Sequence, residues 1–130
     1  MTGRGKILKI LVVEDEPLIR LGVVFLFEDA GYTVSEATNA DEAIRRLETD
    51  PEIRLVVTDV DMPGSMDGIK LAHFVRNRWP PVRLIVVSGK VGVMPEQLPE
   101  GVPFFPKPYA ESQLLSAVGT LFEGGGARRG

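Results

Sequence analysis

The sequence predicts an α/β fold in which a parallel sheet carries helices on both faces. Short apolar runs without polar alternation recur along the 130 residues, as in strands buried on both sides. Segments with apolar residues at helical spacing lie between these runs, and glycine or proline residues separate the two kinds of segment. The alternation repeats about five times, and the length suits a single domain.

The candidate strands are apolar runs rich in Val, Ile, Leu and Phe. Their bounds follow from the turn residues and helical patterns on either side. The expected strands cover residues 7–13, 33–37, 53–58, 82–87 and 102–105.

The candidate helices have recognisable ends. Gly31 stands where a C-terminal cap belongs, Asn39 and Glu42 form a capping box, and Pro80 follows the third helical pattern. The expected helices cover residues 17–30, 39–49, 67–78 and 110–122.

The stretch after the fourth strand breaks the alternation. Pro95, Pro99 and Pro103 recur every four residues, which disfavours an ordinary helix. We expect a reduced fourth helix, at most a short turn over residues 94–98. The domain should cover residues 1–122, and residues 123–130, with almost no apolar side chains, should form a flexible tail.

The first helix carries two apolar stripes. Ile19, Val23 and Phe27 form one of them, and this stripe is either part of a wide buried face or an exposed patch for a partner helix. The other stripe is expected to face the core and comprises Leu18, Leu21, Gly22, Phe25 and Leu26.

Composition excludes several classes of protein. The net charge of −3 and the lack of a basic stripe argue against DNA binding. The absence of cysteine excludes disulfides, thiolate metal sites and a cysteine nucleophile, and suits the cytoplasm. No apolar stretch approaches the roughly 20 residues of a membrane span.

Polar residues gather at the expected strand ends, where ligands bind in open α/β sheets. Carboxylates brought together there repel one another unless a cation neutralises them. Oxygen ligands without a Cys/His set favour Mg²⁺. The residues are Glu14, Asp15 and Glu16 after the first strand, Asp59 and Asp61 after the third, Ser88 after the fourth and Lys107 after the fifth.

This set suggests phosphoryl transfer. Asp59 would attack phosphorus to form an aspartyl phosphate. Mg²⁺ and Lys107 would balance the charge on the transferring group.

The motifs VVEDEP, VVTDVDMPG with MDG, VVSGK and FFPKPY resemble, in order and spacing, the receiver domain of two-component response regulators. The resemblance covers about residues 6–122. It implies a flavodoxin-like, doubly wound sheet of five parallel strands in the order 2-1-3-4-5.

The resemblance also implies a metal site. Asp59 corresponds to the phosphoacceptor, Asp15 to a direct Mg²⁺ ligand and Glu14 to a ligand acting through water. Asp61 stands where the family lends a backbone carbonyl to the metal.

The remaining roles concern the phosphoryl group. Ser88 and Lys107 stand where the family binds it, and Pro108 follows, with a cis bond expected. Phe104 occupies the position of the aromatic switch residue. Lys90 is a surface lysine or, as a weaker hypothesis, a residue that influences dephosphorylation.

The implied function is signalling, with only self-phosphorylation and self-dephosphorylation chemistry and no enzyme turnover. A histidine kinase or a histidine phosphotransfer protein would donate the phosphoryl group. Output would pass to an unknown downstream protein, without an output domain, DNA or membrane.

Three features depart from the family pattern. Glu14 replaces the more usual aspartate, the DMPGSMDG loop is one residue longer, and the stretch from Ser88 to Lys107 is short and rich in proline.

Three alternatives stay open. The segment DVDMP partly matches the signature of haloacid dehalogenase phosphatases, in which Asp61 would be an essential acid/base. A flavodoxin-type FMN carrier would share the fold. A receiver-like domain that works without phosphorylation is the third.

Overall fold

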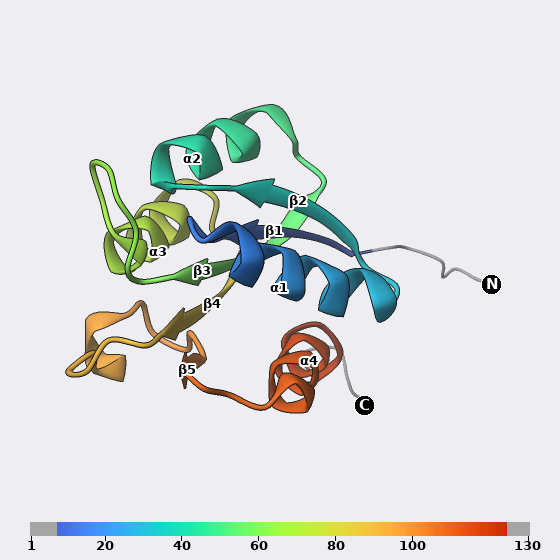
Figure 1. Cartoon of the computed structure of the whole chain (residues 1–130). Helices are drawn as coiled ribbons and strands as arrows, with labels where there is room; N and C mark the ends of the chain where they lie inside the picture. The colour runs from blue at the N-terminus through green and yellow to red at the C-terminus, as the bar shows by residue number, and fades with distance from the viewer. Residues whose placement is uncertain (1–7, 125–130) are drawn as a thin grey trace.

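The computed structural model describes residues 8–124 and contains a sheet of five parallel strands in the order β2-β1-β3-β4-β5 (Figure 1). The expected fold and strand order are confirmed. The strands are β1 (Lys9–Val13), β2 (Thr33–Ala37), β3 (Ile53–Asp59), β4 (Arg83–Ser88) and β5 (Phe104–Pro106).

Helices cover both faces of the sheet and create two cores (Figure 1). One core joins the sheet to α2 and α3, with Leu47 and Leu71 among its buried side chains. The other joins it to α1 and α4, with Phe27 and Leu114. The α-helices are α1 (Pro17–Asp29), α2 (Ala40–Thr49), α3 (Gly68–Arg78) and α4 (Glu111–Gly119).

Local capping explains where two helices begin. The Asn39 side chain accepts a hydrogen bond of 2.8 Å from the Glu42 amide, which starts α2. The Glu42 carboxylate returns to the Thr38 amide rather than to Asn39, one residue earlier than a capping box predicts. Asp67 caps α3 in the same way, accepting from the Lys70 amide at 2.9 Å.

The helix that would connect β4 to β5 is reduced, as expected from the proline spacing. A single 3₁₀ turn, η2 (Pro95–Gln97), replaces it. Two side chains of α3 hold this segment: His73 bonds the Gln97 carbonyl at 2.7 Å, and Arg76 donates to the Glu100 carbonyl at 3.0 Å.

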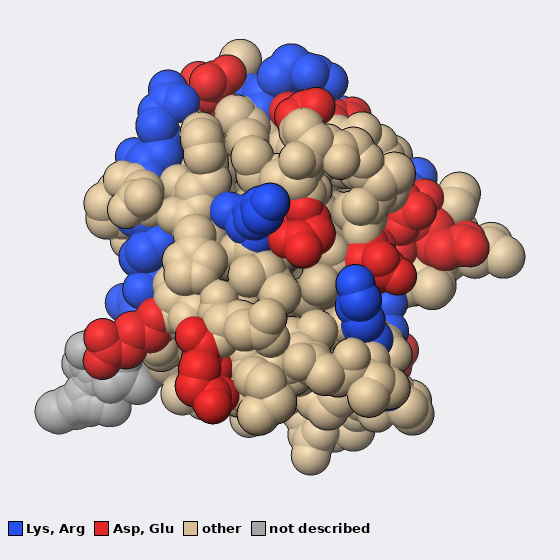
Figure 2. Space-filling view, turned by 90° about the vertical axis from the view of Figure 1, so that its left-hand side faces the viewer, with Lys and Arg blue, Asp and Glu red and all other residues tan. Residues whose placement is uncertain are grey.

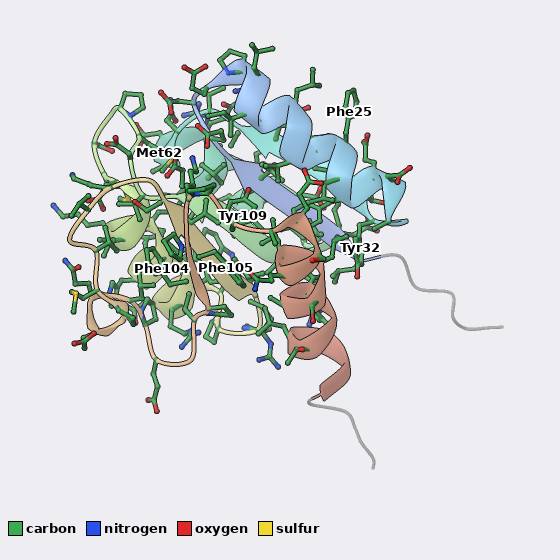
Figure 3. All side chains as sticks on the ribbon, turned by 60° about the horizontal axis from the view of Figure 1, so that its bottom comes forward. Phe25, Tyr32, Met62, Phe104, Phe105 and Tyr109 are labelled. Atoms are coloured by element: carbon green, nitrogen blue, oxygen red, sulfur yellow. The ribbon has the colours of Figure 1, made fainter. Side chains whose placement is uncertain are left out.

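The prediction for the faces of α1 is wrong. Phe27 is fully buried, whereas Leu18 is 80% exposed and Phe25 59% exposed. Figure 3 shows the Phe25 ring pointing away from the body of the molecule. Because α1 is apolar nearly all round, its sequence pattern alone did not identify the buried side; Val24 and Phe27 are the residues that pack onto the sheet.

The C-terminal helix extends beyond α4 as a π-helical turn, η3 (Thr120–Gly124). The expected tail at residues 123–130 lies almost entirely outside the described residues, and the domain boundary at residue 122 stays a prediction. Within residues 8–124, no helix has the length and hydropathy needed to cross a bilayer.

Candidate metal and phosphoryl site

Three acidic side chains meet at the carboxyl ends of β1 and β3. Carboxylate oxygens of Glu14, Asp15 and Asp59 all lie within 4.8 Å of one another. Glu14 and Asp59 are buried, whereas Asp15 is exposed and leaves the group open to solvent. Hard oxygen ligands with one open side fit Mg²⁺, which keeps waters in its shell. We call these three residues the acidic trio.

Lys107 reaches the acidic trio from the far edge of the sheet. Its Nζ lies 3.1 Å from Asp59 Oδ2 and 3.4 Å from Glu14 Oε1. Its backbone amide donates to the Ser88 carbonyl at 2.8 Å, which ties the chain after β5 to the end of β4. Residues 93 positions apart in sequence therefore form one charged cluster.

The electrostatics of the cluster follow from burial and charge. The pKa of Glu14 is raised from 4.5 to about 7, mainly by burial and also by the Asp59 carboxylate, against the opposing effects of the Glu16 amide hydrogen bond and of Lys107. Burial lowers the pKa of Lys107, but the hydrogen bond and charge of Asp59 outweigh it, so the net pKa is raised. Lys107 therefore stays a cation, and the raised pKa of Glu14 allows its carboxylate to take up a proton near neutral pH.

The backbone around Asp59 is packed without spare room. The Gly68 amide donates to the Val60 carbonyl at 2.9 Å, and a Cβ at Gly68 would overlap the Asp59 carbonyl oxygen. Thr58 is buried and donates its hydroxyl to the same carbonyl at 2.9 Å. Sequence reasoning missed Gly68 as a site residue, although it stands in the MDG motif.

Glu14 is held by a backbone amide of its own motif and by a side chain of α1. Its Oε2 accepts from the Glu16 amide at 3.0 Å. Arg20 of α1 donates to the Glu14 carbonyl at 2.8 Å and pairs with Glu36 at 2.9 Å. Arg20 was not identified from the sequence, because only the tertiary structure brings it beside Glu14.

Asp61 lies at the rim of the site rather than within the acidic trio. It lines the same hollow as Glu14, Asp59 and Ile19, and its amide points at Asp59 Oδ1 at 3.4 Å. Its side chain is exposed, and its predicted carbonyl contribution to the metal stays a prediction.

Ser88 is buried at the end of β4 and is bonded to its own loop. Its Oγ accepts from the Lys90 amide at 2.9 Å. Ser88 and Lys107 are thus neighbours through the backbone, and the predicted role of the hydroxyl toward a phosphoryl group stays a prediction.

The expected cis peptide bond between Lys107 and Pro108 is confirmed. Phe104 of β5 is half-buried against the core that contains α3, and Phe105 packs toward Tyr109, as Figure 3 shows. Lys90 is exposed. Figure 2 looks onto the carboxyl edge of the sheet and shows acidic and basic side chains close together amid uncharged surface.

This arrangement agrees with what comparison with known proteins finds. The family model of the response regulator receiver domain matches residues 10–119. The chain belongs to this family.

Relatives and solved structures agree. The receiver protein CpdR of Brucella abortus (strain 2308) is 31% identical over 113 residues, which are 85% of this chain and 92% of CpdR. Sensor kinase CckA of the same organism is 37% identical over 118 residues, 88% of this chain. A crystal structure of a response regulator receiver protein from Sinorhizobium medicae WSM419 superposes with a TM-score of 0.83 at 26% identity, covering 89% of this chain and 94% of that one.

Several curated relatives are much longer than this chain. It spans 12% of the length of CckA and 55% of another relative. The receiver domain therefore occurs both nearly alone and as one part of larger signalling proteins.

Proposed function

We propose that the chain is a phosphoacceptor of a two-component system or phosphorelay, phosphorylated on Asp59. The observation that carries this proposal is the buried Asp59 carboxylate, which lies beside Glu14 and Asp15 and is paired with Lys107 at 3.1 Å. A carboxylate so placed is a nucleophile with a cation ready beside it, as phosphoryl transfer needs.

In the proposed reaction, a carboxylate oxygen of Asp59 forms a bond to phosphorus. The bond between phosphorus and the donor's imidazole nitrogen breaks, and the imidazole leaves with the electron pair. The Lys107 ammonium, which pairs with Asp59 at 3.1 Å, would face the phosphoryl oxygens that gain negative charge. Mg²⁺, when held by Glu14, Asp15 and Asp59, supplies positive charge that offsets the repulsion between the carboxylates and the phosphoryl group.

Ser88 is proposed to report the phosphorylated state. Its hydroxyl oxygen accepts from the Lys90 amide in the present structure. A phosphoryl group on Asp59 offers strong acceptor oxygens, toward which the hydroxyl would turn to donate. The Lys90 amide would then lose its partner, and the loop after β4 would shift.

We also assign the docking surface of the phosphodonor to α1. The apolar patch formed by Leu18, Ile19, Leu21 and Phe25 is exposed, and Ile19 also lines the hollow of the acidic trio. A histidine kinase or histidine phosphotransfer protein that packs a helix here would bring its phosphohistidine to Asp59.

Downstream, the chain is proposed to signal by binding another protein, without DNA binding or enzyme turnover of its own. The exposed apolar side chains Val91 and Met94, in the loop that would shift, offer one such contact. The cytoplasmic location expected from the sequence stays a prediction.

The proposal is tested by incubating the protein with acetyl phosphate and following its intact mass. We expect the gain of one phosphoryl group with Mg²⁺, none with EDTA, and none for Asp59→Asn. A slower gain for Asp61→Asn would still agree. Repeated turnover of a phosphomonoester that requires Asp61 would instead support a phosphatase.

A further inference from the structure

A second polar site lies at the opposite edge of the sheet, where the strands begin. A hollow of about 650 Å³ there is lined by three arginines from β3, α3 and β4 and by an apolar wall. We call it the arginine groove, defined by Arg54, Arg76, Arg83, Pro80, Pro81 and Phe122.

The arginines of the groove differ from most others in the molecule. Within residues 8–124, three arginines elsewhere pair with carboxylates: Arg20, Arg46 and Arg78. In the same part of the chain, the arginines without such a pair are Arg45, Arg54, Arg76 and Arg83. All but Arg45 line the groove, so uncompensated guanidinium groups are concentrated there.

The backbone brings these side chains together. Arg83 is the first residue of β4 and pairs in register with Leu55, the neighbour of Arg54 on β3. The flanking residues Ile53 and Leu84 are buried, which leaves the arginines as the polar positions at the starts of two core strands. Arg76 is half-buried and is oriented by its 3.0 Å hydrogen bond to the Glu100 carbonyl.

The groove combines cationic with apolar lining residues. Pro80 and Pro81 have no backbone N–H, so the donors on that side come from the guanidinium groups. Leu121 and Phe122 of η3 add further apolar side chains to the lining. Glu100 also lines the groove, so one acidic residue accompanies three arginines and an excess of positive charge remains.

We propose that the arginine groove binds a nucleoside diphosphate. Guanidinium forks match phosphoryl oxygens in a bidentate manner, and two adjacent phosphates concentrate enough negative charge to satisfy the excess. The planar base would lie against the apolar lining residues Pro80, Pro81 and Phe122. The volume falls in the range of roughly 300–1,000 Å³ that is usual for small-ligand sites.

The test is an NMR titration of the ¹⁵N-labelled full chain with ADP in EDTA, which keeps divalent ions from linking the nucleotide to the acidic trio. We expect saturable shifts at the amides of Arg54, Arg83 and Phe122. ADP should bind about tenfold or more tightly than adenosine, because adenosine lacks the charge-assisted hydrogen bonds.

Variants sharpen the test. Arg54→Gln combined with Arg83→Gln should weaken ADP binding about tenfold or more, and the corresponding double lysine variant should restore it only in part. Arg45→Gln, which removes an exposed arginine outside the groove, should leave binding unchanged. Circular dichroism should show that all variants are folded.

Three results would overturn the proposal. The first is the absence of saturable shifts in the groove. The second is equal affinity for ADP and inorganic diphosphate, which would show that the base contributes nothing to binding. The third is binding of a polyglutamate peptide in the groove without any response to ADP, which would point to a protein partner instead.

Discussion

The charged side chains at the two edges of the sheet differ in burial. At the carboxyl edge, Glu14 and Asp59 are buried and depend on Lys107 for compensation. At the opposite edge, Arg54 and Arg83 are exposed, and water screens them. Buried charges change pKa values and create reactivity, whereas exposed charges mainly attract ligands. The effects of substitutions at the two edges should therefore differ in kind as well as in size.

The largest effect is expected from removing the cation of the carboxyl edge. Lys107→Met should slow phosphorylation by acetyl phosphate about a hundredfold or more, because a charge facing the transferring group is lost. Intact-mass time courses in saturating Mg²⁺ measure the rate, and Lys70→Met, at an exposed lysine of α3 outside the site, is the surface control. An unchanged phosphorylation rate for Lys107→Met would show that the charge at the carboxyl edge does not create reactivity.

Gly68→Ala should come next. Its Cβ would overlap the Asp59 carbonyl oxygen and contact the Val60 backbone, so either α3 or the end of β3 must move. We expect a loss of about 2–3 kcal/mol in the free energy of unfolding, together with slower phosphorylation. Urea denaturation measures the first effect, and Gly22→Ala, with nothing near its Cβ, should not destabilise the protein. Equal stability of both variants would show that the site backbone is not constrained.

The buried carboxylate should also give stability a dependence on pH. Because the pKa of Glu14 is raised from 4.5 to about 7 in the folded state, its stabilising contribution is present below about pH 4.5 and is lost as the pH rises through 7. In EDTA, Glu14→Gln should therefore be about 1–3 kcal/mol more stable than the wild type at pH 8 and nearly equal to it at pH 4.5.

Urea denaturation at the two pH values checks this expectation. Glu48→Gln, which alters an exposed glutamate, is the control and should show no such trend. If the stability difference between Glu14→Gln and the wild type does not change with pH, the pKa of Glu14 is not raised by burial.

A smaller effect is expected at the surface of α1. Phe25→Ala should slow phosphotransfer from a phosphohistidine donor protein several-fold to tenfold, through the loss of an apolar contact. The rate with acetyl phosphate should not change, because that donor needs no docking surface. Val91→Ala removes another exposed apolar side chain, outside the patch, and serves as the control. If Phe25→Ala slows phosphorylation by both donors, the substitution acts on the phosphorylation site rather than on docking.

The smallest effect is expected at the opposite edge. Arg54→Gln should leave the free energy of unfolding within about 0.5 kcal/mol of the wild type, because its side chain is exposed and makes no ion pair among the described residues. Thermal denaturation measures this. A large loss in the free energy of unfolding would show that the arginine charge at this edge stabilises the fold.

The sequence predicted the sheet and the gathering of polar residues because both depend on local patterns. Asp59 and Lys107 directly follow apolar runs, and the carboxyl ends of parallel strands share one edge. The prolines after Ser88 likewise predicted the reduced helix that η2 confirms.

Other features were not predictable because they arise from tertiary contacts. The apolar residues of α1 surround the helix, so only packing shows that Phe27 is inside and Phe25 outside. Gly68 matters through its approach to Asp59, and Arg20 through its bond to the Glu14 carbonyl. Neither contact leaves a periodic signal in the sequence.

The central claim is that the acidic trio and Lys107 make Asp59 the residue that receives the phosphoryl group. The most direct measurement is to phosphorylate the protein in Mg²⁺, reduce the acyl phosphate with borohydride, and locate the modified residue by peptide mass spectrometry. The account predicts one modified residue, Asp59, and none in EDTA. Modification at Asp15 or Asp61 in its place, or at Asp59 without a divalent ion, would contradict it.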